Sequence, residues 1–438
     1  MNNASLELGG TNWAEKDGNI LGYSVGDTSG KYSPQEFTFA RGSNLSATRI
    51  DRAGLIVKGR ENQLLQSNQF DTTWLNQLGG TITGGQAGYD GSSDAWLISK
   101  DASNFRSVRQ VISFSGVSTF SIYAKSGTLT DAALRMDTSA GAIQIVYDLS
   151  AGVVASSGGV FISNGIEDVG GGWYRIFVTA NVSSGTNVHI YADRSGTTAG
   201  SIYIQDAQLE SSLAASPYIP TTTTSAQAGV LENTPRLNYT TGVANPYLLL
   251  EPSRTNLESY SEYFNAAAVK INVVITPNAT TSPEGVVNAS SLLDNATNGN
   301  HTFYSSYSTT SASGTTITHS IFAKANSNSW FQITSGSQTS DQWANFDLTN
   351  GVVGNSSASA NADIQPMGNG WYRCIINSTT TTTNASVASI IILTNNVNIT
   401  TRNTSYAGNG NGVYVYGLQT EIGSYATSYI PTYSVSAT

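Results

Sequence analysis

The feature that most constrains this chain is an internal repeat. Four short phrases occur in the first half and return in the same order in the second. The first set is 120–125 (FSIYAK), 147–154 (YDLSAGVV), 172–175 (GWYR) and 218–221 (YIPT), and the second set is 319–324 (HSIFAK), 346–353 (FDLTNGVV), 370–373 (GWYR) and 429–432 (YIPT). Order is kept and only the intervening lengths change, which is typical of a duplicated domain with variable loops. We therefore predict two copies of one domain, over residues 62–224 and 255–438.

Each copy has the pattern of a β-domain. Segments such as 174–180 (YRIFVTA) alternate apolar and polar residues, as half-buried strands do. Glycine clusters at 170–172 and 408–412 separate such segments, and no stretch keeps a helical period. Several short strands in a domain of this size predict an all-β fold of two tandem jelly-roll-like β-sandwiches.

The remaining segments hold too little apolar mass for a third core. Residues 1–61 predict an extended N-terminal arm with a small hairpin that attaches to another protein. Residues 225–254 predict a linker with one short β element around 247–250.

Composition excludes several function classes. Charged residues make up 11% of the 438 residues, and 20 Lys and Arg against 29 Asp and Glu give a net charge of −9. Without a basic stripe to neutralise phosphates, we expect no nucleic-acid partner. The single cysteine, Cys374, excludes a disulfide framework and a cysteine-based zinc site. Apolar runs such as 390–393 are too short for membrane insertion, and the first residues lack the pattern of an export signal.

Several phrases resemble a recurrent module of tailed-bacteriophage virion proteins. The first segment of this module, here called the lead-in, is similar to residues 39–43 (FARGS), 47–50 (ATRI) and 54–56 (GLI) of this chain. The segment that follows it, here called the continuation, is similar to residues 235–239 (PRLNY), 248–257 (LLLEPSRTNL) and 260–264. The closing strands of the module are similar to residues 370–373, 413–421 and 429–432. The resemblance implies a sandwich similar to carbohydrate-binding modules and lectins, carried by head decorations, head fibres, tail fibres or tail appendages. Lead-in and continuation, contiguous in the usual pattern, are here separated by the whole first sandwich. One sandwich was therefore inserted or duplicated.

The sequence contains few residues or motifs that could form a catalytic site. Of the three histidines, His189 lies in an alternating strand, His319 replaces Phe120 of the first copy, and the third is His301. Cys374 takes an apolar strand position, and no serine-hydrolase, zinc-protease or P-loop motif is present. We predict that the chain is not an enzyme.

Two carboxylate pairs recur in the repeat and are the alternative to that prediction. They are Asp148 with Asp347 and Glu210 with Glu421. Glycoside hydrolysis would need two carboxyls in one cleft. The alternative for Asp148 and Asp347 is a turn-initiating side chain that accepts backbone N–H bonds.

Metal binding stays open. Jelly-roll glycan binders that the chain resembles hold structural Ca²⁺ on acidic loops. Asp90, Asp94 and Asp101 cluster in the first copy, and the second has only Asp294 nearby.

Tryptophans are the candidate glycan-binding residues, because aromatic faces stack on sugar rings. Trp96, Trp330 and Trp343 lie outside the repeated phrases and have polar neighbours, although packing between sheets is their alternative role. The repeated Gly-Trp-Tyr-Arg phrase instead predicts structural anchors. These anchors are Trp173, Tyr174, Arg175, Trp371, Tyr372 and Arg373, with each arginine paired to a carboxylate or carbonyl of its own sandwich.

Together these observations predict a non-enzymatic structural protein on the outer surface of a phage virion, made in the cytoplasm of the bacterial host. We expect a head decoration or head fibre that attaches to capsid or tail proteins through residues 1–61, forms homo-oligomers on the particle and displays sandwiches that bind host or mucosal glycans. The alternative is a tail fibre or receptor-binding protein that recognises a host glycan.

Overall fold

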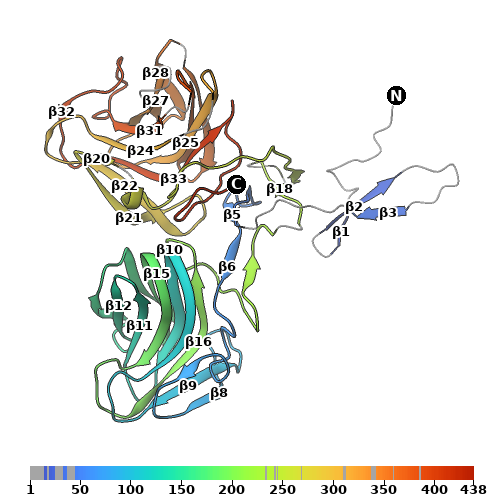
Figure 1. Cartoon of the computed structure of the whole chain (residues 1–438), viewed down its shortest axis with the longest axis vertical. Helices are drawn as coiled ribbons and strands as arrows, with labels where there is room; N and C mark the ends of the chain where they lie inside the picture. Colours follow the sequence, from blue (N-terminus) through green and yellow to red (C-terminus); the bar gives the residue numbers. More distant parts are fainter. Residues whose placement is uncertain are drawn as a thin grey trace. The chain divides into compact units, whose positions relative to one another are not determined.

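The chain forms two compact units, one of which is built from two separate stretches of sequence. The computed structural model describes residues 45–438 apart from 232–233, 241–242, 244, 268, 309–311, 337–341, 359 and 384–385, and within 1–44 it describes strands β1 (Ala14–Lys16), β2 (Asn19–Ser24) and β3 (Ser33–Glu36). Residues 60–228 form one unit, here called sandwich 1. Of the described residues, 45–59 and 229–438 belong to the other unit, which contains sandwich 2. Sandwich 1 is thus inserted into the sequence of the second unit (Figure 1).

Sandwich 1 consists of two β-sheets that share two long strands. Its strands are β7 (Leu75–Asn76), β8 (Ile82–Gln86), β9 (Ala95–Lys100), β10 (Ser107–Ser126), β11 (Asp131–Thr138), β12 (Gly141–Asp148), β13 (Val153–Gly158), β14 (Ser163–Gly170), β15 (Trp173–Ala192) and β16 (Gly200–Glu210). One sheet has the order β14-β15-β10-β16-β9-β8, and the other β13-β12-β11-β15-β10-β7. Both β10 and β15 run through the two sheets, and their register shifts between Val111 and Gly116, where each strand passes from one sheet to the other.

Sandwich 2 has the same two layers with separate strands. They are β20 (Val269–Ile271), β21 (Val273–Thr281), β22 (Val287–Asp294), β23 (Asn298–Gly299), β24 (Thr302–Ser308), β25 (Thr316–Ala325), β26 (Trp330–Ser335), β27 (Trp343–Asp347), β28 (Val352–Ser356), β29 (Asn361–Gly368), β30 (Trp371–Thr379), β31 (Ser386–Leu393), β32 (Tyr406–Ala407) and β33 (Gly412–Ile422). A single helical turn, α1 (Phe264–Ala267), precedes them. Among the described residues, no helix has the length and apolarity needed to cross a membrane.

The strand orders of the two sandwiches correspond position by position. The sheet β8-β9-β16-β10-β15-β14 matches β21-β22-β33-β25-β30-β29, and the sheet β7-β10-β15-β11-β12-β13 matches β20-β24-β31-β26-β27-β28. Apolar side chains between the two sheets form one core cluster in each sandwich, for example Leu134 and Ile190 in the first and Ile333 and Ile391 in the second. The predicted fold of two jelly-roll-like sandwiches is confirmed.

The lead-in segment folds with sandwich 2. Strands β4 (Thr48–Ile50) and β5 (Ile56–Lys58) form a hairpin whose Ile56 is buried in a cluster with Phe322, Trp371 and Tyr416. The short pair β18 (Leu237–Asn238) and β19 (Tyr247–Leu248) joins it, since the Ile50 N–H donates to Asn238 Oδ1 at 2.6 Å. In sandwich 1, β6 (Arg60–Asn62) pairs with β17 (Ala226–Ala228) at the point where the chain enters and leaves.

These segments differ from the sequence prediction. We expected an attachment arm over 1–61 and a linker over 225–254, whereas residues 45–59 and 229–254 belong to the compact unit of sandwich 2. The reason is long-range packing: Lys58 is buried and lies 2.9 Å from Glu262 and 2.6 Å from Glu284. Contacts so distant in sequence leave no local pattern. Apart from the backbone of β1–β3, the predicted arm over 1–44 lies outside the described residues.

Candidate functional site

The repeated Trp-Tyr-Arg residues occupy equivalent structural positions. Trp173 and Trp371 are buried at the start of β15 and β30. Arg175 donates to the Ser216 carbonyl oxygen, and Arg373 Nη1 donates to that of Thr427 at 2.6 Å. The sequence predicted a carboxylate or carbonyl partner, and the partner is a carbonyl in both copies.

The two tyrosines explain a repeated glycine. A Cβ at Gly152 would lie 2.9 Å from the Tyr174 ring, and one at Gly351 would lie 2.5 Å from the Tyr372 ring. Both glycines also have φ near +66°, which disfavours side chains. The Asp-Leu-x-x-Gly phrase is therefore a turn under a tyrosine.

The repeated carboxylates are held by structural contacts. Asp148 Oδ1 accepts the N–H groups of residues 150 and 151, and Asp347 Oδ1 accepts those of residues 349 and 350. Glu210 and Glu421 are buried, and each accepts a glutamine amide two residues away on the same strand, at 2.7 and 2.8 Å. The turn interpretation of Asp148 and Asp347 is confirmed.

The aspartates that were candidate metal ligands also form hydrogen bonds or ion pairs within the protein. Asp90 and Asp94 both accept from the Gln205 amide, whereas Asp101 is separate and pairs with Arg106 at 3.0 Å. Asp294 Oδ1 accepts three consecutive N–H groups of residues 409–411. Within the described ranges, no group of three His, Cys, Asp or Glu side chains is placed to hold a metal ion.

Two titratable residues of sandwich 2 are buried among strands. His319 bonds Ser389 Oγ at 2.7 Å, and burial lowers its pKa to about 3. Cys374 is fully buried, and burial raises its pKa. Neither side chain reaches solvent.

The three candidate tryptophans lie in different settings. Trp96 is 8% exposed, belongs to the core cluster and lines a cavity of about 480 Å³ together with Asn68, Asp94 and Tyr218. Trp343 is also 8% exposed, and Trp330 is half-buried. The structure does not bring these three residues together.

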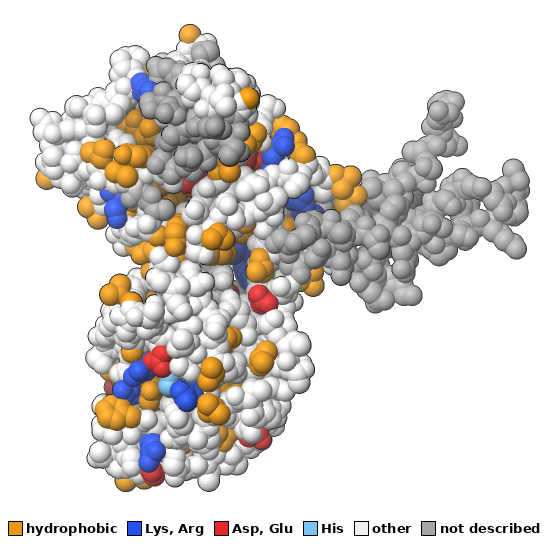
Figure 2. All heavy atoms as spheres, viewed as in Figure 1, with side chains coloured by type: hydrophobic (Ala, Val, Ile, Leu, Met, Phe, Trp, Pro, Cys, Tyr) orange, Lys and Arg blue, Asp and Glu red, His pale blue; other side chains and the backbone are white. Residues whose placement is uncertain are grey.

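A different group of residues gathers on the outer face of sandwich 1. Arg109, His189, Arg135 and Gln144 are register partners on β10, β15, β11 and β12. Paired residues point to the same face of a sheet, and the alternate residues such as Leu134 lie in the core, so this row faces outward. Figure 2 shows basic, acidic and histidine side chains gathered with apolar ones on this sandwich. We call the row, with Phe105, Asp137, Tyr191 and Arg194, the outer-face site.

One carboxylate organises the centre of the site. Asp137 Oδ1 accepts from Arg135 Nε at 2.7 Å, and Oδ2 lies 2.9 Å from His189 Nε2. Because a carboxylate only accepts, Nε2 carries the imidazole proton and Nδ1 accepts from Ser107 Oγ at 3.2 Å. Burial would raise the pKa of Asp137, but the bonds from Arg135 and His189 lower it.

The Arg194 side chain is held by two aromatic rings and a glutamine amide. Its guanidinium carbon lies 3.8 Å from the Phe105 ring centre and 4.9 Å from that of Tyr191. Its Nε donates to Gln144 Oε1 at 2.7 Å. Guanidinium groups stack well on aromatic rings, so this arginine is held in one orientation.

The site carries excess positive charge. Burial lowers the pKa of His189 despite Asp137, and Arg135 and Arg109 lower it further, so the ring is neutral at pH 7. Three guanidinium groups then face one carboxylate. Arg109 Nε and Arg194 Nη1 are buried and have no hydrogen-bond partner among the described residues.

The equivalent face of sandwich 2 has uncharged residues in its row and lies under a longer loop. Register places Tyr304, Ile390, Thr334 and Trp343 at the four row positions, none of them charged. The loop between β31 and β33 lies over this sheet: Gln332 donates to the residue 401 carbonyl at 3.0 Å, and Asn345 donates to that of 399 at 2.6 Å. The matching loop of sandwich 1 spans only 193–199, and its Arg194 lies against the row, where it bonds Gln144.

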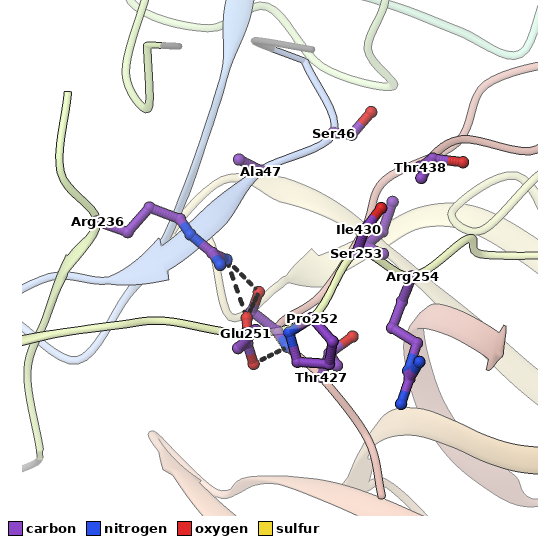
Figure 3. A pocket seen from close by; sticks show the side chains of 11 residues that line it. Ser46, Ala47, Arg236, Glu251, Pro252, Ser253, Arg254, Thr427, Ile430 and Thr438 are labelled. Atoms are coloured by element: carbon purple, nitrogen blue, oxygen red, sulfur yellow. Dashed lines mark hydrogen bonds and ion pairs between the residues drawn. The ribbon is translucent and has the colours of Figure 1, made fainter. Parts of the chain in front are cut away.

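A cleft of about 290 Å³ lies in the unit of sandwich 2, where the lead-in meets residues 236–254 and 427–438. Arg236 pairs with Glu251 at 3.0 Å and donates to Ser428 Oγ at 2.6 Å. Figure 3 shows Arg236 reaching Glu251, while Arg254 extends separately. The paired groups join the continuation, residues 235–257, to the closing segment at Ser428, so this cleft is a contact within the fold of this unit.

Sequence reasoning missed every arginine of the outer-face site. The alternation in sequence predicts only a strand position for His189, and no repeated phrase points to Arg109, Arg135 or Arg194 as binding residues. A usable signal existed for three of them: Arg109, Arg135 and His189 sit at alternating strand positions of a weakly charged chain, and the second copy has no charge at the row positions.

Comparison with known proteins does not identify a family for this chain. No family model matches the chain, and no curated protein matches it. Among solved structures, the chain is similar to the N-terminal CBM22-1–CBM22-2 tandem domain of Xyn10C from Paenibacillus barcinonensis, with 8% identity, a TM-score of 0.26, and 88% of this chain and 100% of that chain covered. Oxalate decarboxylase from Bacillus subtilis follows with 10% identity, a TM-score of 0.10, and 84% and 79% covered. At such TM-scores the fold assignment rests on the strand order itself.

Proposed function

We propose that this chain is a non-enzymatic virion surface protein of a tailed bacteriophage, and that sandwich 1 binds glycans through the outer-face site. One observation carries the binding role: the outer face of one sheet presents guanidinium and amide groups in one row, and the Phe105 ring stacks on Arg194 beside that row. Sugars are recognised by such a combination, since rings pack on apolar faces while hydroxyls take hydrogen bonds.

The engaged state of the carboxylates supports the absence of catalysis. A glycosidase acid must be free to protonate the leaving group. Asp148 and Asp347 instead accept turn N–H groups, and Glu210 and Glu421 are buried in side-chain networks. A chain that only holds its ligand fits these contacts.

The sequence resemblance supports the virion location. Lead-in, continuation and closing phrases resemble the phage module, and we propose a head decoration or head fibre present as a homo-oligomer in many copies. Weak sites arrayed on one particle gain avidity through their effective concentration. Residues 45–59 are folded with sandwich 2, so we assign attachment to residues 1–44.

Immunogold electron microscopy of intact virions tests the location, with an antibody raised against residues 62–220. Gold scattered over the heads is the expected result. Gold confined to the tail tip would replace the head assignment with the tail-fibre alternative, and unlabelled virions would overturn the virion role.

A further inference from the structure

We infer that the outer-face site selects acidic glycans, using the guanidinium groups of Arg109 and Arg194 to hold carboxylate or sulfate groups of the sugar. This inference rests on the proposed glycan-binding function and adds the charge class of the ligand.

The first step is the local charge. Asp137 is shared between Arg135 and His189, which leaves no carboxylate for Arg109 or Arg194 within the site. Asp131 and Asp148 lie on the same two central strands, but four residues further along, roughly 13 Å from the row. Asp148 is also occupied by its own turn. An anionic group on the ligand would supply the missing counter-charge.

The second step is the open hydrogen-bonding capacity. Arg109 Nε and Arg194 Nη1 have no partner among the described residues, and both atoms are shielded from solvent. Both side chains are only half-buried, so a ligand would reach the guanidinium groups through their other nitrogens. Buried donors are normally satisfied, and a guanidinium prefers carboxylate or sulfate oxygens, which accept charge-assisted bonds. Phe105 and Tyr191 hold Arg194 in place, so little side-chain entropy is lost on binding.

The third step separates a sugar from a simple ion. Exposed apolar side chains flank the charged groups: Phe105 is 58% exposed, Leu75 46% and Val111 65%. Leu75 is the register partner of Arg109, and Val111 lies two residues along the same strand. Such surfaces suit the C–H faces of a pyranose beside its anionic substituent.

Sandwich 2 supplies an internal contrast. Its row has Tyr304, Ile390, Thr334 and Trp343 in place of the charged residues, and its face lies under the 394–405 loop. The duplication has therefore produced one basic face beside a short loop and one uncharged face under a longer loop. Acidic-glycan binding belongs to sandwich 1 alone.

Biolayer interferometry on the full chain tests this inference. The immobilised probes are polygalacturonate for carboxylate, heparin for sulfate, dextran for a neutral glycan, and single-stranded oligothymidine as a non-sugar polyanion. The variants are R109Q, R194Q and the double variant, and K125Q removes one charge from the other sheet of the same sandwich as a matched control. Thermal melts establish that each variant is folded.

The inference predicts binding to polygalacturonate or heparin, weakened roughly 10- to 100-fold in the double variant and by added salt, and unchanged in K125Q. Preference for one of the two probes identifies the anionic group. Dextran binding that equals acidic-glycan binding and survives R109Q/R194Q would overturn the charge class but leave the proposed glycan function standing. Absence of binding to every glycan would overturn both, and equal arginine-dependent binding of oligothymidine would replace the glycan with a general polyanion.

Discussion

Lys58→Met tests whether the lead-in hairpin is part of the unit of sandwich 2. Lys58 Nζ lies 2.9 Å from a Glu262 oxygen and 2.6 Å from a Glu284 oxygen, and all three side chains are almost fully buried. Burial would lower the pKa of Lys58, but the two carboxylates raise it above its usual value. Methionine keeps the side-chain length and removes the charge.

Loss of the ammonium leaves two buried carboxylates without a cation. Tyr416 and Tyr429 donate hydrogen bonds to Glu262, but they carry no charge to offset it. Removing one partner of a buried ion pair costs about 3–5 kcal/mol. Burial already raises the pKa of Glu262, with Glu284 adding to the effect and Lys58 opposing it. Without Lys58, protonation relieves the site, so the destabilisation is largest near neutral pH and shrinks as the pH falls.

Hydrogen exchange in a urea series separates the two units. Peptides from β25 report sandwich 2, and peptides from β10 report sandwich 1. K58M should lower the unfolding free energy of the β25 peptides at pH 7.5 and leave the β10 peptides unchanged, whereas K58M/E284Q should recover part of the loss. Lys125→Met, which removes a half-buried lysine from sandwich 1, should stay within about 0.5 kcal/mol of the wild type. A K58M effect below about 0.5 kcal/mol on β25 would refute the buried ion cluster.

Three further predictions concern buried polar groups. Burial lowers the pKa of His319 to about 3, so sandwich 2 loses stability as the pH falls below about 6.5, roughly 2 kcal/mol between pH 7 and 5; H319F should flatten this part of a melting-temperature profile. Burial raises the pKa of Asp206 to about 7, so sandwich 1 loses stability as the pH rises from about 4 to 7, by about 2–4 kcal/mol; D206N should remove that slope, and a slope that persists would assign it elsewhere. R373A leaves the Thr427 carbonyl without its buried donor and should cost sandwich 2 about 2–3 kcal/mol in urea denaturation, with an unchanged midpoint counting against the anchor role.

The repeat made much of the fold predictable. Residues that recur at fixed places report requirements of the architecture, which is why a turn role for Asp148 and a carboxylate or carbonyl partner for Arg175 could be predicted from the sequence; the structure selects the carbonyl. The separated lead-in and continuation also indicated an insertion. The pairing of Lys58 with Glu262 could not be predicted, because residues so far apart meet only when both stretches dock on one sheet.

The outer-face site, in contrast, could not be predicted from the residues that the two copies share. Arg109, Arg135 and His189 do not recur in the second copy, and a search for shared residues passes over them. Their role depends on register across three strands and on the short loop 193–199, which adds Arg194 to the face. The sequence instead favours tryptophans as glycan-binding residues, although Trp96 lies in the core cluster. Differences between repeats, rather than identities, mark this site.

The most direct test of the account is an array of host and mucosal glycans probed with the full chain, followed by an assay for newly released reducing ends. The account predicts saturable binding to a subset of glycans, lost in the R109Q/R194Q variant, with no release of sugar. Release of reducing ends, or an array without any bound glycan, would contradict it.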